Sequence, residues 1–153
     1  MIDLDSNIVI VLVDDNEDDR MLAARALQRA GVVNEVIMLA DGVEALEFFA
    51  QASKTEATAL RTYLVLLDLN MPRLGGLEVL RGLRESRATR RLQIVVLTSS
   101  DEDRDLVDSY DLGANSYIRK PVDFAQFSEV IRQLGHYWLA LNRPAPGGLT
   151  STG

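Results

Sequence analysis

The chain has 153 residues, of which 47% are hydrophobic and 25% are charged, and this fits one globular domain with a real core. Its net charge of −7 gives no electrostatic reason to bind nucleic acid or an anionic membrane, and the arginines Arg87, Arg90 and Arg91 are typical of a solvated helix end. Without cysteine, and with the single histidine His136, the chain excludes disulfides and Cys- or His-cluster metal sites.

The chain opens with polar residues 1–7, which do not resemble a signal peptide. The apolar run Ile8–Val13 is too short to span a bilayer, so we expect a cytoplasmic protein. The run is β-branched and does not alternate with polar residues, which indicates a strand buried on both faces. It ends at two aspartates; Asn16 can then cap a helix that Gly31 ends.

The same alternation of apolar runs and helix-patterned segments continues along the chain. It predicts strands over 33–39, 63–67, 93–97 and 115–118, and helices over about 43–52, 77–83, 101–112 and from about 123 onward. Strands that alternate with helices imply right-handed crossovers, hence an α/β fold: a doubly wound, flavodoxin-like three-layer sandwich with a five-stranded parallel sheet. We expect one domain over 1–141, with a loop or ragged helix extension at 53–62, and a disordered tail over 142–153.

Three acidic residues follow strands of this sheet. Asp14 and Asp15 follow the first strand, and Asp68 follows the third. If the strand order is 2-1-3-4-5, which is known for one common doubly wound fold, these strands are neighbours at the switch point where ligands bind. Carboxylates gathered there repel one another and call for a hard cation such as Mg²⁺. The alternative is that Asp14 and Asp15, with Asn16, only cap the first helix.

Asp68 adds weight to the metal site because a charge directly after a buried strand is costly unless it is partnered. A carboxylate there could attack phosphorus and form an acyl phosphate. Phosphoryl transfer needs mainly positioning and charge neutralisation, and Lys120 after the fifth strand would supply a cation at the same edge. Thr98 closes the fourth strand with a hydroxyl donor. Taken alone, Lys120 is typical of a surface lysine.

Taken together, these residues resemble the receiver domains of two-component response regulators. The resemblance covers about residues 9–134 and rests on the following residues: Asp14, Asp15, Asp68, Met71, Pro72, Gly76, Thr98, Lys120 and Pro121. It implies that Asp68 is the phosphoacceptor and that Mg²⁺ binds Asp15, Asp68 and the backbone carbonyl of Asn70, with Asp14 acting through metal-bound water.

The resemblance also implies a switch. Thr98 would hydrogen-bond the phosphoryl oxygen and move with it, Lys120 would pair with the phosphoryl group, and Tyr117 would turn inward when Thr98 moves. Tyr117 could instead be an ordinary half-buried aromatic of an edge strand. Such a domain is a signalling module and not a classical enzyme. Its implied partners are a sensor histidine kinase and a downstream phosphotransfer or effector protein.

The last predicted helix carries an apolar stripe longer than the core needs. Its members follow steps of three and four residues: Phe124, Phe127, Ile131, Leu134, Trp138 and Leu141. Either the stripe faces the core, or Tyr137, Trp138 and Leu141 pack on a second copy in a homodimer. With the insert at 53–62, the stripe resembles the single-domain receivers that pair with phytochrome-type histidine kinases.

Two other functions fit parts of the pattern. A Mg²⁺-dependent hydrolase could also use a nucleophilic aspartate with a lysine, but Asn70 stands where a general acid would follow Asp68 by two residues. A phosphorylation-independent adaptor could retain the motif without using it. We expect the receiver function, with no nucleic-acid and no membrane partner.

Overall fold

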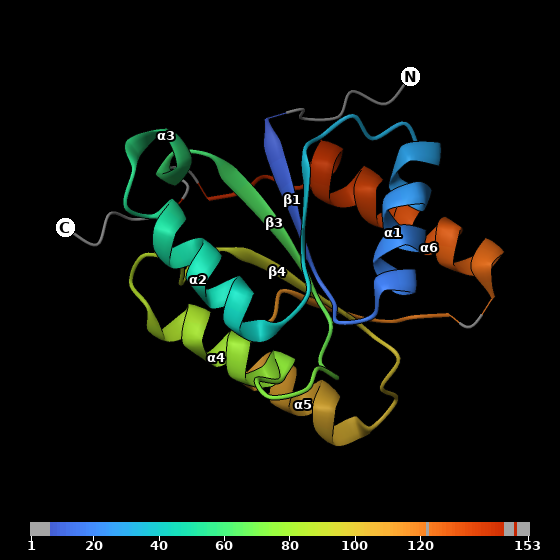
Figure 1. Ribbon diagram of the computed structural model, residues 1–153. Helices are drawn as coiled ribbons and strands as arrows, with labels where there is room; N and C mark the ends of the chain where they lie inside the picture. Colours follow the sequence, from blue (N-terminus) through green and yellow to red (C-terminus); the bar gives the residue numbers. More distant parts are fainter. Residues whose placement is uncertain (1–6, 122, 146–148, 150–153) are drawn as a thin grey trace.

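The computed structural model describes residues 7–121, 123–145 and 149 of the chain (Figure 1). Its centre is a five-stranded parallel sheet in the order β2-β1-β3-β4-β5, as predicted. The strands are β1 (Ile8–Val13), β2 (Val36–Leu39), β3 (Thr62–Leu67), β4 (Gln93–Thr98) and β5 (Ser116–Arg119). The doubly wound α/β fold is therefore confirmed.

The apolar runs become strands because both faces of the sheet are covered. All six residues of β1 are buried, and its alternate side chains enter two separate cores. The edge strand β2 is shorter than the predicted 33–39. Residues 33–35 precede the strand: Val33 is exposed, the side chain of Asn34 donates to the carbonyl of Ile8, and the carbonyl of Glu35 accepts the backbone N–H of Ile10.

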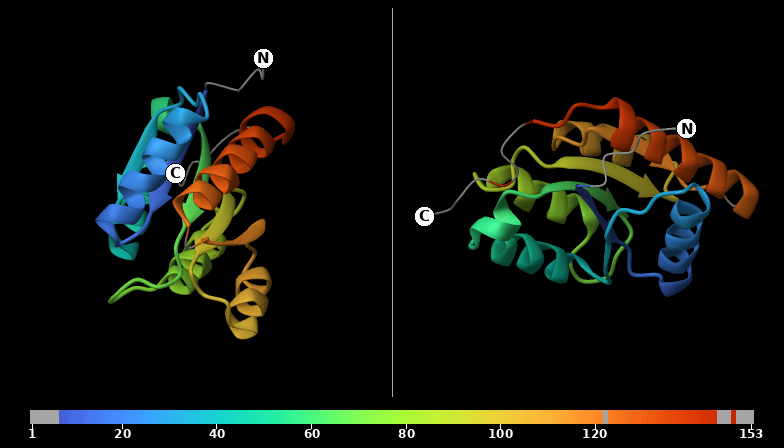
Figure 2. Two further views of the ribbon diagram at one scale, coloured as in Figure 1. Left: turned by 90° about the vertical axis from the view of Figure 1, so that its right-hand side faces the viewer. Right: turned by 90° about the horizontal axis from the view of Figure 1, so that it is seen from above.

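The helices form one layer on each side of the sheet (Figures 1 and 2). On one side, α1 (Glu17–Arg29) packs beside α6 (Phe124–His136). The other side carries α2 (Gly42–Ala52), α4 (Gly76–Glu85) and α5 (Asp103–Asp111). Three helix starts, those of α1, α2 and α6, are capped by side chains: Asn16, Asp41 and Asp123 each accept a backbone N–H of the first turn.

The segment at 53–62, predicted as a loop or a helix extension, contains a short helix of its own, α3 (Glu56–Ala59). Thr58 fixes it to the preceding helix by donating its hydroxyl to the carbonyl of Ala52, and the hydroxyl of Tyr63 donates to the carbonyl of Thr58 at 2.8 Å. These bonds keep the segment against the end of the sheet.

One of the residues that the dimer hypothesis places at an interface is buried within the chain itself. After α6 the chain forms a π-helical turn, η1 (Tyr137–Leu141). Trp138 continues the buried stripe of Phe127, Ile131 and Leu134, and with Leu139 it lies in the core of the chain itself. Trp138 is 9% exposed, whereas Tyr137 and Leu141 are 50% and 60% exposed. Of the three residues expected to contact a second copy, Trp138 is therefore occupied by intramolecular packing.

The predicted tail over 142–153 is described only at residues 142–145 and at Leu149; its other residues lie outside the described part of the chain. Leu149 is buried in the core on the α2 side, and its backbone N–H donates to the carbonyl of Ala59 at 2.7 Å. This contact joins the far end of the chain to α3.

Candidate functional site

The sheet register brings the strand-end carboxylates together. Val13 of β1 pairs with Leu67 of β3, so both strands end in step and Asp14 and Asp68 follow at the same level. The backbone N–H of Asp68 continues the ladder by donating to the carbonyl of Val13 at 3.0 Å. The parallel register thus places these acids at one edge of the sheet, as expected from the sequence.

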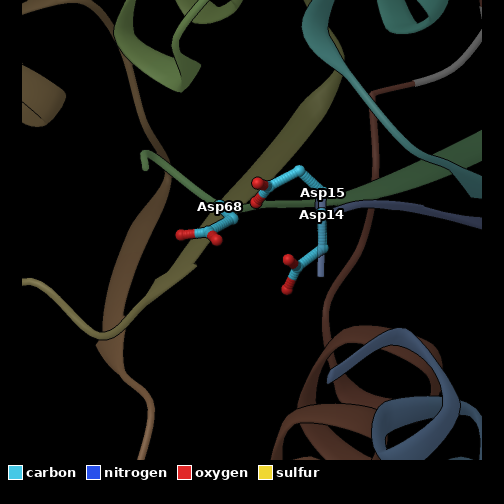
Figure 3. Close-up of side chains that lie close together, drawn as sticks. All are labelled: Asp14, Asp15 and Asp68. Carbon is cyan, nitrogen blue, oxygen red and sulfur yellow. The ribbon is translucent and has the colours of Figure 1, made fainter. Parts of the chain in front are cut away.

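The three carboxyl groups form one cluster (Figure 3). Oxygen atoms of Asp14, Asp15 and Asp68 all lie within 4.8 Å of one another. Asp14 and Asp68 are only 3% and 7% exposed, and Asp15 faces solvent. The prediction that these residues converge is confirmed. Carboxylates this close repel one another, so the cluster favours a cation at its open side.

Lys120 brings one positive charge into this cluster. Its ammonium group donates to Asp14 at 2.5 Å and to Asp19 at 3.0 Å, and it lies 3.6 Å from Asp68. Burial alone would lower the pKa of Lys120, but the hydrogen bond to Asp14 and the charge of Asp68 raise it above its ordinary value. Lys120 is therefore a fixed cation at the carboxylate cluster.

One lysine does not neutralise the cluster. Burial raises the pKa of Asp14 above its ordinary value, although the hydrogen bonds from Lys120 and Asn16 oppose the change. The donor set at the open side is made only of oxygens, which suits a hard divalent ion that keeps part of its water shell. The residues present fit a divalent metal by both charge and donor chemistry.

Thr98 lies beside the cluster, but among the described residues its hydroxyl makes hydrogen bonds to Asn70 and Ser100 and none to Asp68. Its side chain is fully buried, and its hydroxyl oxygen lies 3.4 Å from both the amide nitrogen of the Asn70 side chain and the backbone nitrogen of Ser100. Asn70 in turn donates its backbone N–H to the carboxylate of Asp68 at 3.3 Å. Asn70 therefore links the phosphoacceptor candidate to the buried hydroxyl.

Tyr117 contacts the loop that follows Thr98. Its hydroxyl donates to the carbonyl of Ser100 at 3.0 Å, and its half-buried ring packs against the core on the α2 side. Burial raises the pKa of the Tyr117 hydroxyl. The hydroxyl of Ser100 donates to Asp105 at 2.5 Å, which ties the same loop to α5. Ser100 therefore connects the two side chains: its backbone N–H donates to Thr98, and its carbonyl accepts from Tyr117.

The backbone around Asp68 is held by a close approach of Gly76. A Cβ atom placed on Gly76 would lie 2.2 Å from the carbonyl oxygen of Asp68 and 2.6 Å from the Cα of Leu69. The backbone N–H of Gly76 also donates to the carbonyl of Leu69 at 3.0 Å. A side chain at position 76 would therefore displace the loop that carries Asp68.

Sequence reasoning missed two residues of α1 that complete the site. Asp19 pairs with Lys120, and Arg20 donates to the backbone carbonyl of Asp14 at 2.6 Å. The signal that could have found them is helical spacing: Asp19 and Arg20 lie one turn after the strand-end acids, on the helix that Asn16 caps.

The sheet is doubly wound, acids follow its two adjacent central strands β1 and β3, and a lysine follows the edge strand β5. This arrangement is typical of a class of signalling domains that carry a phosphoacceptor aspartate at the switch point. The chain belongs to one family of that class, the response regulator receiver domains, whose pattern matches residues 10–132. The stated resemblance is thus confirmed. Receiver domains of this family serve two-component systems and are phosphorylated on an aspartate.

Several relatives cover almost the whole chain. The probable methanogenesis regulatory protein FilR2 of Methanothrix harundinacea is 35% identical over 147 residues, which is 96% of this chain and 93% of the relative. The response regulator Rcp1 of Synechocystis is 34% identical over 131 residues, with 86% and 88% covered.

Solved structures agree with this family and with its chemistry. The phosphorylated cyanobacterial phytochrome response regulator RcpA superposes with a TM-score of 0.80 at 36% identity, over 89% of this chain and 96% of its own. The Mn²⁺-bound form of Rcp1 superposes with a TM-score of 0.78 at 30% identity, over 90% and 98%. Receiver domains thus bind divalent metal and pair with histidine kinases. Among the described residues, no helix is long and apolar enough to cross a membrane.

Proposed function

We propose that this chain accepts a phosphoryl group on Asp68 from a sensor histidine kinase, assisted by Mg²⁺, and that the modification changes a protein-interaction surface. The observation that carries the proposal is the buried carboxylate of Asp68 at the end of β3, within 4.8 Å of the oxygens of Asp14 and Asp15 and 3.6 Å from the ammonium of Lys120. A nucleophile, a metal-type donor set and a cation thus meet at one point.

The transfer step follows from the nucleophile. A carboxylate oxygen of Asp68 attacks the phosphorus of a phosphohistidine; the new P–O bond forms as the P–N bond breaks, and its electron pair goes to the departing imidazole nitrogen. Lys120 neutralises charge on the transferred group. Asn70 donates its backbone N–H to the carboxylate of Asp68 and so keeps the nucleophile oriented.

The metal would be held by Asp14, Asp15 and Asp68, with the backbone carbonyl of Asn70. When bound, Mg²⁺ supplies positive charge that offsets the negative charge of the phosphoryl oxygens. The Mn²⁺-bound form of Rcp1 supports a divalent ion in this family, and the all-oxygen donor set of this chain supports the harder Mg²⁺.

We propose that Thr98 and Tyr117 read the phosphoryl group. The hydroxyl oxygen of Thr98 accepts hydrogen bonds from Asn70 and Ser100. The same hydroxyl can donate its proton, and a phosphoryl oxygen on Asp68 would be a charged and therefore strong acceptor for it. Movement of Thr98 would release Ser100, whose carbonyl holds Tyr117. The phosphoryl group then stabilises a conformation that the domain already samples.

The phosphoryl mimic BeF₃⁻ tests this function. With Mg²⁺ present, we expect BeF₃⁻ to shift the amide resonances around Asp68, Thr98 and Tyr117 in a two-dimensional NMR spectrum. Without Mg²⁺, or in Asp68→Ala, the shifts should vanish because the carboxylate or the charge that holds the mimic is missing. No shift in the wild-type protein, or an equal shift in Asp68→Ala, would reject the proposal.

The kinase partner is proposed by similarity. RcpA is named a phytochrome response regulator, and this chain shares its fold at 36% sequence identity, so we propose a phytochrome-type histidine kinase as phosphoryl donor. Phosphotransfer profiling against the histidine kinases of the same organism tests this: transfer from a phytochrome-type kinase should be fastest, and preferential transfer from a kinase of another sensor type would contradict it.

A homodimer through the last helix remains a proposal, now with fewer contact residues. Tyr137 and Leu141 expose half or more of their side chains at η1, where they could meet a second copy. We expect light scattering at micromolar concentration to show two subunits, and Leu141→Ser to shift the population toward the monomer because it removes exposed apolar area. A wild-type monomer, with and without BeF₃⁻, would contradict the dimer.

A further inference from the structure

The ammonium of Lys120 is held closer to helix α1 than to the phosphoacceptor candidate. Its two hydrogen bonds go to Asp14 at 2.5 Å and to Asp19 at 3.0 Å, whereas the nearest oxygen of Asp68 lies 3.6 Å away, beyond hydrogen-bond distance. The side chain of Lys120 is 9% exposed, so its position is set by these carboxylates and much less by water.

Asp19 belongs to the first turn of α1 and has no part in the predicted metal site. Its side chain is 38% exposed, and its backbone N–H is fixed by the Asn16 cap at 3.0 Å. Its carboxylate reaches Lys120 from the side of the helix, while the oxygens that cluster for a metal belong to Asp14, Asp15 and Asp68. Asp19 therefore acts on the site through Lys120.

Resting on the proposed phosphorylation of Asp68, we propose that Asp19 is a positioning residue that holds Lys120 away from Asp68 in the unphosphorylated protein and so lowers the affinity of the site for a phosphoryl group.

The charge of Asp19 should weaken phosphoryl binding in two ways. A phosphoryl group replaces the single negative charge of the Asp68 carboxylate by nearly two on its own oxygens, so the site gains about one negative charge. To pair with it, Lys120 must give up or lengthen its contact with Asp19, and the charge of Asp19 also repels the incoming group. Both effects oppose phosphoryl binding. Replacing the carboxylate by an amide removes both, because the amide oxygen can still accept a hydrogen bond but carries no charge.

The test compares Asp19→Asn with Asp18→Asn. Asp18 lies next to Asp19 in the same first turn of α1 and is exposed, but among the described residues Lys120 pairs with Asp14, Asp19 and Asp68 and not with Asp18. Both substitutions remove one charge from the same helix end, so their difference isolates the contact with Lys120. The measurement is the affinity for BeF₃⁻ at saturating Mg²⁺, followed by NMR on the full chain, with the Mg²⁺ affinity measured separately.

We expect Asp19→Asn to bind BeF₃⁻ about two- to fivefold more tightly than the wild type, the effect of removing one partly exposed ion pair, and Asp18→Asn to change the affinity by less than about 1.5-fold. The Mg²⁺ affinity of the two variants should be equal. A general disturbance of the site by Asp19→Asn would change the Mg²⁺ affinity as well. Equal BeF₃⁻ affinities for the two variants, or weaker binding by Asp19→Asn, would overturn the role of Asp19. A wild-type protein that does not respond to BeF₃⁻ at all would instead reject the proposed function.

Discussion

Replacing Gly76 by alanine is expected to destabilise the domain and to impair phosphoryl acceptance together. The new methyl carbon would lie 2.2 Å from the backbone oxygen of Asp68 and 2.6 Å from the Cα of Leu69. Because both obstacles are backbone atoms, no rotamer change can relieve the clash, and the loop carrying Asp68 must move. Overpacking of this kind costs about 1–3 kcal/mol, and we expect the upper end of that range.

Urea unfolding at equilibrium measures the loss of stability, and labelling by acetyl phosphate measures the loss of acceptance. The matched control is Gly75→Ala, because a methyl group on this neighbouring glycine would meet only the carbonyl oxygen of Leu69, at an ordinary 3.6 Å. Gly75→Ala should unfold within about 0.5 kcal/mol of the wild type, as surface substitutions usually do. If Gly76→Ala were as stable and as reactive as Gly75→Ala, the close approach would not matter.

The second large effect is expected from Trp138→Ala. Trp138 belongs to the core that the sheet, α1 and α6 form on one side, and its ring lies edge-to-face with Tyr137 at 5.1 Å between centroids. Removing so large a buried side chain leaves a cavity and costs about 3–5 kcal/mol. Thermal and urea unfolding of the monomer, measured at low protein concentration, should both show this loss.

Leu141→Ala is the control for Trp138→Ala. It removes an apolar side chain from the same π-helical turn, but this side chain is 60% exposed, so we expect a loss of less than about 0.5 kcal/mol. A similar cost for both variants would mean that Trp138 is not packed in the monomer. The contrast also decides how the dimer is tested: Trp138→Ala would destabilise the subunit itself, whereas changes at Tyr137 or Leu141 act on the exposed face.

The strands of the sheet could be predicted because buried parallel strands appear in the sequence as unbroken apolar runs. Their order could not be read from these runs and was taken from a known doubly wound fold. Ile8–Val13 has no polar residue, and the acids that follow it mark the strand end unambiguously. The site followed from the same rule, since the carboxyl ends of parallel strands share one edge. The weakest strand prediction was β2, an edge strand whose side chains are only partly buried, so that no continuous burial constrains its first residues.

Other features depend on three-dimensional packing that no local pattern encodes. The apolar stripe is buried as far as Trp138, but Leu141 is exposed because a π-helical turn departs there from α-helical spacing. The approach of Gly76 to Asp68 and the contact of Asp19 with Lys120 join residues from different elements. A glycine before a helix and an acid in a first turn are both common, so neither stands out in the sequence.

Phosphorylation of Asp68 is tested most directly by finding the residue that carries the phosphoryl group. The protein is treated with acetyl phosphate and Mg²⁺, the acyl phosphate is reduced with borohydride, and the digested peptides are sequenced by mass spectrometry. We expect homoserine at position 68, dependent on Mg²⁺ and strongly reduced in Lys120→Ala. A modification at Asp14 or Asp15 instead, or no modification of the wild-type protein, would contradict it.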